Sequence, residues 1–471
     1  MARLLGIDIG TTGCKAVVVD DKGRTVWQHS VSYPLSTPHP GWTEQNPEDW
    51  WNAVQECLDR VKNKVDAVGL TGQMHGSVFL DERGQVVRPA LLWNDQRTAG
   101  EVREMADTLG LQNIYEATCN PPLTGFQAPK ILWLKKNEPE AFAKVRSVLL
   151  PKDYIRFRLS GERYAEVSDA SGTGLFHVPE RRWAHELIEG LGLDPCLFPA
   201  AAESWEPTAM CKGGKLDGVP IVGGGGDQAA GAVGTGAVEP EIISVSLGTS
   251  GVVFAAQETA EYDPQGTVHT FCHANGAWHS MGVMLSCGGA LRWARDSLGF
   301  ASYDEMASLA RGARRSGATF KPYLAGERTP HNDPSLRGSL SGLSLADGRA
   351  EIARAVFEGV TFGLLDGYEV LQRLRGKQES EPVLRVTGGG AKSDYWMQLL
   401  ADSFSAPAVR LEADEGPAFG AAILAGVGAS LWPDVRSACR DVVRTGQRFQ
   451  PDDERRARLR DARHAWLGRT Q

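Results

Sequence analysis

The sequence LLGIDIGTTG at residues 4–13 sets the pattern for the whole chain. Its first six residues predict a short apolar strand, and the Gly-Thr-Thr-Gly word that follows predicts a turn before a second strand at residues 16–19. A similar word, GTSG at residues 248–251, lies about half a chain length further on, again between two predicted strands. Because the word recurs in a matched strand–turn–strand setting, we expect an internal duplication into two similar α/β domains that face each other.

Length and composition limit the class of protein. A chain of 471 residues is too long for one typical hydrophobic core, so two or three domains are expected. Hydrophobic residues make up 42% and charged residues 23%, as in soluble globular proteins. The net charge of −8 argues against nucleic acid or a membrane surface as the main partner. The eight cysteines form no C-x-x-C pair and no signal-peptide pattern opens the chain, so we expect a cytoplasmic protein with free thiols.

Hydrophobic periodicity predicts the remaining elements. Further strands are expected at residues 25–31, 65–70, 219–222, 241–247, 252–256 and 383–386. Helices are expected at residues 47–62, 129–137, 154–159, 285–298, 351–374, 393–404, 417–424 and 455–467. The last helix carries mixed charges, which are typical of a solvated face.

The stretch GGGGDQAAGAVG at residues 223–234 places a carboxylate at a strand-to-helix corner. Asp227 follows four glycines and precedes an alanine-rich, helix-compatible segment. One interpretation is a helix N-cap, the commoner use of aspartate at such a corner. The other is a functional carboxylate, because the glycines let a ligand approach the backbone closely.

Glycine-rich turns follow four of the predicted strands, at residues 10–13, 223–226, 248–251 and 388–390. One such turn is usually only a turn, but backbone N–H groups at several of them can form nests for phosphate. Hydroxyl donors stand in two of these loops, at Thr11, Thr12, Thr249 and Ser250, so two facing loops would hold a triphosphate from both sides. The chain has no G-x-x-x-x-G-K-[ST] word and no G-x-G-x-x-G after its first strand, which argues against P-loop and dinucleotide-binding folds.

Two further side chains are candidates for ligand binding. Asp8 precedes the first glycine-rich loop, where a carboxylate can hold Mg²⁺ through water or can cap the turn. His75 lies in the loop TGQMHG at residues 71–76, directly after a predicted strand. Loop histidines are commonly structural, but the flanking glycines favour a contact with a ligand.

Together these segments resemble the FGGY family of carbohydrate kinases along nearly the whole chain. Residues 8–12 match the family's first phosphate loop, and GFQAPKILW at residues 125–133 is similar to its first signature, with Gln127 where Pro, Ser or Thr is usual. The second signature matches GSLSGL at residues 338–343 and its continuation at residues 351–358. Within the family, the segments QMHG, WNDQR and GERTP, at residues 73–76, 93–97 and 326–330, are similar to members that phosphorylate D-xylulose.

The resemblance implies a fold of two tandem actin-like (ribonuclease H-like) α/β domains around a central cleft, at residues 1–238 and 239–471. It implies ATP-dependent phosphorylation of D-xylulose to the 5-phosphate, with Mg²⁺ as cofactor and with neither nucleic acid nor membrane as partner. Kinases for another pentulose, a polyol or a deoxy sugar are alternatives within the family, and a homodimer is compatible with it. A non-catalytic actin-like ATPase or a sugar sensor is a third kind of alternative, and the presence of both Asp8 and Asp227 argues against the sensor.

The same resemblance assigns roles to individual residues. Asp227 would be the general base, and the adjacent helix end would lower its pKa and keep it ionised. The sugar would be bound by Met74, His75, Asp227 and Gln228, where many members have Asn at the last position. Asp8 would hold Mg²⁺ through water. The phosphates and adenosine of ATP would contact Thr11, Thr12, Lys15, Gly248, Thr249, Gly389, Gly390, Ala391 and Ser393.

Overall fold

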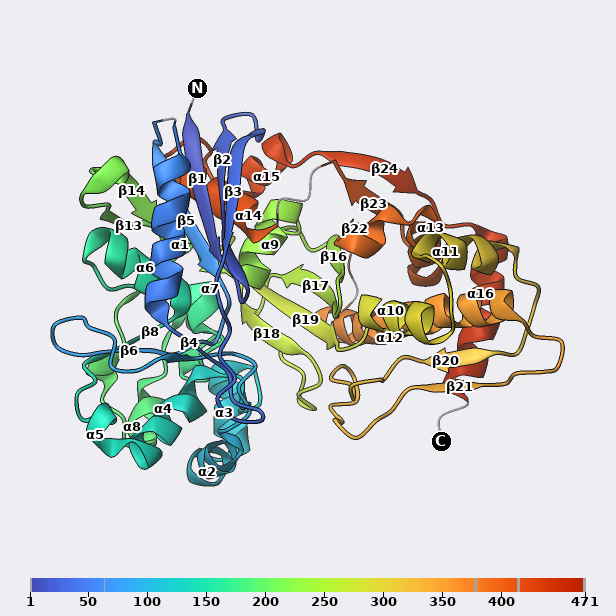
Figure 1. Ribbon diagram of the computed structural model, residues 1–471, viewed down its shortest axis with the longest axis horizontal. Coiled ribbons are helices and arrows are strands. Elements are labelled where there is room, and N and C mark those ends of the chain that lie inside the picture. Colours follow the sequence, from blue (N-terminus) through green and yellow to red (C-terminus); the bar gives the residue numbers. More distant parts are fainter. Residues whose placement is uncertain (1, 63, 377, 379, 413–415, 469–471) are drawn as a thin grey trace.

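The computed structural model describes the chain except residues 1, 63, 377, 379, 413–415 and 469–471. Its elements are organised around two seven-stranded mixed sheets, one in each half of the chain, that lie side by side in Figure 1. None of the helices in this described part combines the length and the apolar composition needed to cross a lipid bilayer.

The first sheet has the strand order β13-β14-β5-β1-β2-β3, and a short strand β15 also pairs with β5. β1 runs antiparallel to β2 and parallel to β5. The strands are β1 (Arg3–Ile9), β2 (Gly13–Asp20), β3 (Thr25–Ser32), β5 (Ala67–Gly72), β13 (Pro207–Met210), β14 (Pro220–Val222) and β15 (Gly225–Gly226).

The second sheet has the order β18-β19-β17-β16-β22-β23-β24. β16 runs antiparallel to β17 and parallel to β22. Its strands are β16 (Ile242–Leu247), β17 (Gly251–Gln257), β18 (His269–Cys272), β19 (Trp278–Met284), β22 (Val383–Thr387), β23 (Ala408–Leu411) and β24 (Thr445–Phe449).

The two sheets share one topology. If β16 is matched to β1, then β17, β19, β22, β23 and β24 match β2, β3, β5, β14 and β13 in order. Every matched pair of neighbours also has the same direction: the three strands around each Gly-Thr loop are antiparallel, the next two are parallel, and the outer one is antiparallel. The duplication expected from the repeated Gly-Thr word is therefore present in the fold.

Short strands and helices complete the two halves. The strands are β4 (Glu44–Gln45), β6 (Val78–Leu80), β7 (Ala90–Leu91), β8 (Ser147–Leu149), β9 (Ala165–Glu166), β10 (Phe176–His177), β11 (Arg182–Trp183), β12 (Ala201–Ala202), β20 (Thr319–Lys321) and β21 (Ser339–Ser341). The helices of the first half are α1 (Pro47–Arg60), α2 (Ala99–Leu109), α3 (Leu111–Thr118), α4 (Gln127–Asn137), α5 (Pro139–Phe142), α6 (Pro151–Ser160), α7 (Val167–Ala170), α8 (His185–Gly190), α9 (Asp227–Thr235) and the 3₁₀ turns η1 (Pro195–Leu197) and η2 (Gly214–Leu216). Those of the second half are α10 (Gly288–Ser297), α11 (Tyr303–Gly312), α12 (Arg349–Arg375), η3 (Gly389–Lys392), α13 (Asp394–Phe404), α14 (Pro417–Gly428), α15 (Val435–Val442) and α16 (Asp453–Leu467).

Helix α1 illustrates how the local sequence sets an element. The Asn46 side chain accepts a hydrogen bond from Glu48 N, and Pro47 at the first helical position has the backbone angle that a helix start requires. The helix then buries one apolar stripe against β2 and β3, formed by Trp50, Ala53, Val54, Cys57 and Leu58. It ends two residues before the expected end at residue 62.

Helix α14 connects the two halves of the chain. Although it comes late in the sequence, it packs against β1, β5 and α9 of the first half, where Figure 1 shows it beside the blue strands. Gly6 and Gly69 make this possible, because a Cβ atom at either position would lie 1.9 Å from the carbonyl oxygen of Ala418 or Ala421 on the helix. The first sheet is therefore covered on this face by a helix that the chain supplies only after completing most of the second sheet.

Candidate active site

The two candidate carboxylates, Asp8 and Asp227, meet at one end of the first sheet. Thr71 of β5 pairs with Asp8 of β1 on one side and with Gly225 of β15 on the other. The loop that carries Met74 and His75 leaves the same end of β5. Ligands of α/β sheets bind outside the carboxyl ends of parallel strands, which is where these segments converge.

Asp227 is the first residue of helix α9, and the capping position belongs to Gly226. Because Gly226 occupies the capping position, Asp227 is not the N-cap, and the N-cap interpretation is wrong. Its Oδ1 accepts a hydrogen bond from Gln228 Nε2 at 3.4 Å.

The pKa of Asp227 also differs from the expectation. Burial raises this pKa to about 6, although hydrogen bonds from Gln228 oppose the shift. The expected lowering by the helix end is therefore wrong, because loss of hydration outweighs the favourable dipole. At neutral pH the Asp227 carboxyl group is therefore still ionised in most molecules and can accept a proton.

Asp8 lies beside Lys15 in the register of β1 and β2. Burial and the charge of Asp227 raise the pKa of Asp8 to about 7, while Lys15 acts in the opposite direction. Its Oδ1 is buried with no hydrogen-bond partner within the described protein. Two neighbouring carboxylates with an unsatisfied buried oxygen fit a divalent cation, which would balance their charge and accept oxygen ligands.

His75 adopts a left-handed backbone conformation, with φ of 66°. Its Nδ1 lies 2.6 Å from the carbonyl oxygen of Gly172, so Nδ1 carries the proton and donates it. Burial lowers the pKa of His75 to about 3, so the ring is neutral and Nε2 is its hydrogen-bond acceptor. The ring stacks on Phe126 with centroids 4.8 Å apart.

The histidine loop packs closely on the Asp227 corner. A Cβ atom at Gly226 would lie 2.8 Å from Cγ of Met74, and one at Gly172 would lie 2.5 Å from Cε1 of His75. Glycine is required at both positions, because a larger residue would push Met74 or His75 out of place. The sequence alone assigns no role to Gly172, or to Phe126 of the first signature, because only the tertiary fold brings them to the loop.

Two buried residues of α4 hold the histidine loop from behind. Lys130 Nζ donates to the carbonyl oxygens of His75 at 2.8 Å and Gly125 at 2.5 Å. Gln127 Nε2 donates to Gly76 O at 3.0 Å. Gln127, the unusual residue of the first signature, thus has a hydrogen-bond partner in the histidine loop.

The two Gly-Thr loops are built differently in their details. In the first, Thr11 Oγ1 accepts a hydrogen bond from Trp93 Nε1 at 3.0 Å, and Thr12 is exposed. In the second, Gly248 and Thr249 are exposed, and their carbonyl oxygens accept hydrogen bonds from the first residues of α10, Gly288 N at 2.8 Å and Gly289 N at 3.0 Å.

The expected adenosine residues lie together after β22. Gly389, Gly390 and Ala391 belong to η3, and Ser393 caps α13 by accepting a hydrogen bond from Trp396 N at 3.4 Å. The Ala391 carbonyl oxygen accepts from Arg410 Nε at 2.7 Å.

A cleft of about 220 Å³ separates the two halves next to Asp227. Asp227 and Gln228 line it from α9, and Thr387 and Gly388, which directly precede η3, line it from the second sheet. Its other lining residues include Ser244, Ser246, Val252 and Phe254. The cleft thus places Asp227 and Gln228 opposite the residues that directly precede the expected adenosine segment. Met74 and His75 lie in the loop beside the Asp227 corner and do not line this cleft. The two Gly-Thr loops lie at the ends of the sheet strands and do not line it either.

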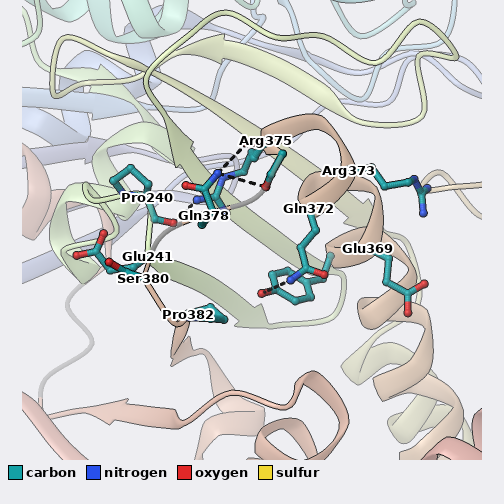
Figure 2. Close-up of a pocket in the computed structure, with 11 residues that line it drawn as sticks. Pro240, Glu241, Glu369, Gln372, Arg373, Arg375, Gln378, Ser380 and Pro382 are labelled. Atoms are coloured by element: carbon teal, nitrogen blue, oxygen red, sulfur yellow. Dashed lines mark hydrogen bonds between the residues drawn. The ribbon is translucent and has the colours of Figure 1, made fainter.

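A larger cavity of about 550 Å³ lies in the second half (Figure 2). Its wall includes Glu241 before β16 and Glu369 and Gln372 on α12, while Arg375 donates a hydrogen bond to the Pro240 carbonyl oxygen. The residues expected at the active site are all described, and none of them lines this cavity. We therefore take the cleft beside Asp227 as the candidate active site.

Two duplicated α/β domains around a cleft with paired carboxylates and glycine-rich loops are the architecture of actin-like sugar kinases. Family models agree: the N-terminal domain of the FGGY family of carbohydrate kinases matches residues 3–234, and its C-terminal domain matches residues 243–429. The chain belongs to the FGGY family of carbohydrate kinases, enzymes that use ATP.

Relatives with more specific names cover nearly the whole chain. The xylulose kinase of Escherichia coli (strain K12) is 41% identical over 440 residues, 90% of either protein. The crystal structure of a "xyloylose kinase" from Brucella ovis is 37% identical and has a TM-score of 0.92 over 99% of this chain and 98% of that one. The gluconate kinase from Lactobacillus acidophilus has the same TM-score at 26% identity, over 99% and 97% of the two chains.

Proposed function

We propose that this carbohydrate kinase transfers the γ-phosphoryl group of ATP to the primary hydroxyl of D-xylulose, which gives D-xylulose 5-phosphate. The observation that carries the proposal is the packing of the Met74–His75 loop directly on the Asp227 corner, at the cleft between the domains. A sugar bound at that loop would present a hydroxyl to a carboxylate that is ionised at neutral pH. Identity of 41% to a xylulose kinase supports the choice of sugar.

In this mechanism Asp227 is the general base and accepts the hydroxyl proton as the sugar oxygen attacks the γ-phosphorus in line. The neutral ring of His75 accepts a hydrogen bond from a sugar hydroxyl at Nε2, because Nδ1 is committed to Gly172. Met74 packs against the sugar, and the amide of Gln228, already bonded to Asp227 Oδ1, orients both the base and the substrate. Phosphoryl transfer depends mainly on such positioning and on neutralising charge.

The phosphate side of the site comes from both domains. Thr11, Thr12 and Lys15 would hold the phosphates from the first domain, and Gly248 and Thr249 from the second. Gly389, Gly390, Ala391 and Ser393 would line the adenosine pocket. Asp8 would hold Mg²⁺ through water, and this cation would neutralise charge on the phosphate oxygens when bound. With the chain divided into domains at residues 1–238 and 239–471, closure of the cleft would exclude water from the reacting groups.

A substrate panel tests the proposal. ADP release is measured with D-xylulose, other pentuloses, glycerol, a deoxy sugar and gluconate, each with Mg²⁺ and with excess chelator. We expect the highest kcat/KM for D-xylulose and loss of turnover without the metal. A higher kcat/KM for a polyol, for gluconate or for another pentulose would contradict the assignment of D-xylulose, and sugar-independent ADP release would favour a different kind of ATPase.

Replacement of His75 by alanine is expected to raise KM for D-xylulose by about tenfold or more, the effect of losing a polar group built to pair with a substrate hydroxyl. KM for ATP should change little, because the ring lies on the sugar side of Asp227. His75→Asn is the matched control for the backbone, since asparagine tolerates the left-handed conformation that alanine does not favour. Steady-state kinetics for both substrates check this, and an equal rise in both KM values would mean that His75 is only structural.

A further inference from the structure

A cluster of buried charged residues lies behind the Asp227 corner and takes no part in the proposed reaction. Lys152 of α6 is fully buried, with its Nζ 2.7 Å from Asp153, 3.3 Å from Asp169 and 3.7 Å from Glu166. All three carboxylates are buried as well. Burial of so many charges is costly unless they are paired in a defined geometry. The contacts of these side chains show which neighbouring segments the cluster holds in place.

Four hydrogen bonds hold the Glu166 carboxylate in place. Its Oε1 accepts hydrogen bonds from Ser168 N at 2.8 Å and Ser204 Oγ at 2.6 Å. Its Oε2 accepts from Asp169 N at 3.1 Å and from Ser168 Oγ at 2.9 Å. The hydroxyl proton of Ser168 is therefore committed to Glu166, and the oxygen of that hydroxyl is oriented to accept a hydrogen bond.

The hydrogen bond that Ser168 accepts comes from the Asp227 corner itself. Gly226 N donates to Ser168 Oγ at 3.1 Å, and Gly226 immediately precedes Asp227. The preceding glycines are tied to the same region, since Gly224 N donates to Ser204 O at 2.7 Å and Arg156 donates to Gly223 O. The four glycines have no side chains of their own to anchor the backbone, so these hydrogen bonds add to the restraint from the pairing of β15 with β5.

We propose that Ser168, oriented by Glu166, is a positioning residue that fixes the Gly226 amide and thereby holds the Asp227 carboxylate at the attacking hydroxyl. This inference rests on the proposed role of Asp227 as the base. Met74 of the sugar loop packs on the same glycine, because a Cβ atom at Gly226 would lie 2.8 Å from Met74 Cγ. The charged cluster and the sugar loop thus both contact the corner, as a precisely placed base requires.

The test compares two buried serines that have the same hydrogen-bonding pattern. Ser160 is the control, because its Oγ also accepts from a backbone amide, Glu162 N at 3.1 Å, and donates to an acceptor, Arg156 O at 2.8 Å, but it does not contact the glycine corner. Ser168→Ala should lower kcat by about tenfold, since a misplacement of about 1 Å can slow a reaction by about 10²-fold and the remaining contacts of the corner limit the shift. KM for D-xylulose and ATP should stay within about twofold, because Ser168 touches neither substrate.

The control variant Ser160→Ala should lower Tm to a similar extent as Ser168→Ala and leave kcat near the wild-type value.

Two further variants keep the result decisive. Ser168→Cys, with a weak acceptor of similar size, should have an intermediate kcat and serves if Ser168→Ala does not fold. In an Asp227→Ala background, Ser168→Ala should cause no further loss of kcat, because its effect acts through the base. A normal kcat in Ser168→Ala together with a low kcat in Asp227→Ala would overturn the positioning role alone. A normal kcat in Asp227→Ala would instead overturn the proposed base, and the positioning role with it.

Discussion

Replacement of Asp227 by alanine is expected to lower kcat for sugar phosphorylation by about 10²- to 10⁴-fold, the usual contribution of a general base. The carboxylate would no longer accept the hydroxyl proton, whereas the groups proposed to bind ATP would remain in place. ADP release measures kcat, and titration calorimetry with ATP measures binding. Turnover at the wild-type rate would contradict the assignment of the base.

The same experiment has a pH component. Because only the ionised carboxylate can accept a proton, kcat of the wild-type enzyme should fall as the pH drops through the pKa of Asp227, which burial raises to about 6. The residual activity of Asp227→Ala should lack this dependence. Tm measured over the same pH range controls for unfolding at the acidic end.

Replacement of Gly69 by alanine is expected to lower the free energy of unfolding by about 3 kcal/mol, at the upper end of the usual cost of overpacking. A Cβ atom there would lie 1.9 Å from the carbonyl oxygen and 2.7 Å from the carbonyl carbon of Ala421. Both are backbone atoms of α14, so the helix must move away from β5 as a unit. Denaturant unfolding, followed by circular dichroism, measures the change.

Gly100→Ala is the matched control for this prediction. Gly100 belongs to α2, and a Cβ atom there would meet nothing within 4 Å. Alanine at that position should therefore stabilise the protein by about 0.5 kcal/mol, because it restricts the unfolded chain and favours the helix. An unchanged unfolding midpoint for Gly69→Ala would mean that α14 does not depend on close contact with the first sheet.

Two of the helices that periodicity did not predict share a physical cause. Helices α2 and α11 each bury only two residues, so neither has a clear apolar stripe in its sequence. Helix α15 is not predicted, although it buries Val435, Ala438, Cys439 and Val442. Helix α1, which has a strong stripe, is predicted within two residues of its end. Helix α14 was also predicted, but the sequence gives no sign that it packs against the first sheet, because the pairing of Gly69 with Ala421 joins positions that are far apart in the chain.

The candidate site divides in the same way. Asp8, His75 and Asp227 could be found from the sequence, because each stands beside glycines at the end of a strand. Ser168 and Gly172 could not, because their partners lie tens of residues away and no motif surrounds them. Lys130 lies within the first signature, but that motif does not reveal its hydrogen bond to the His75 carbonyl oxygen. The interpretation of Asp227 as a helix cap was wrong because the helix starts one residue earlier than that role requires. Gly226 takes the capping position, and Asp227 becomes the first helical residue.

By itself the sequence determined the duplicated α/β architecture, because strand periodicity and glycine-rich turns are local properties that need no distant partner. It also determined that a carboxylate, Asp227, stands at a glycine corner between the two halves. Only the tertiary structure decided that this carboxylate is half-buried with a raised pKa, and that a hydrogen bond to Ser168 holds its loop. The physical reason is that hydration and side-chain restraint depend on which segments pack together, and that packing is decided by the fold as a whole.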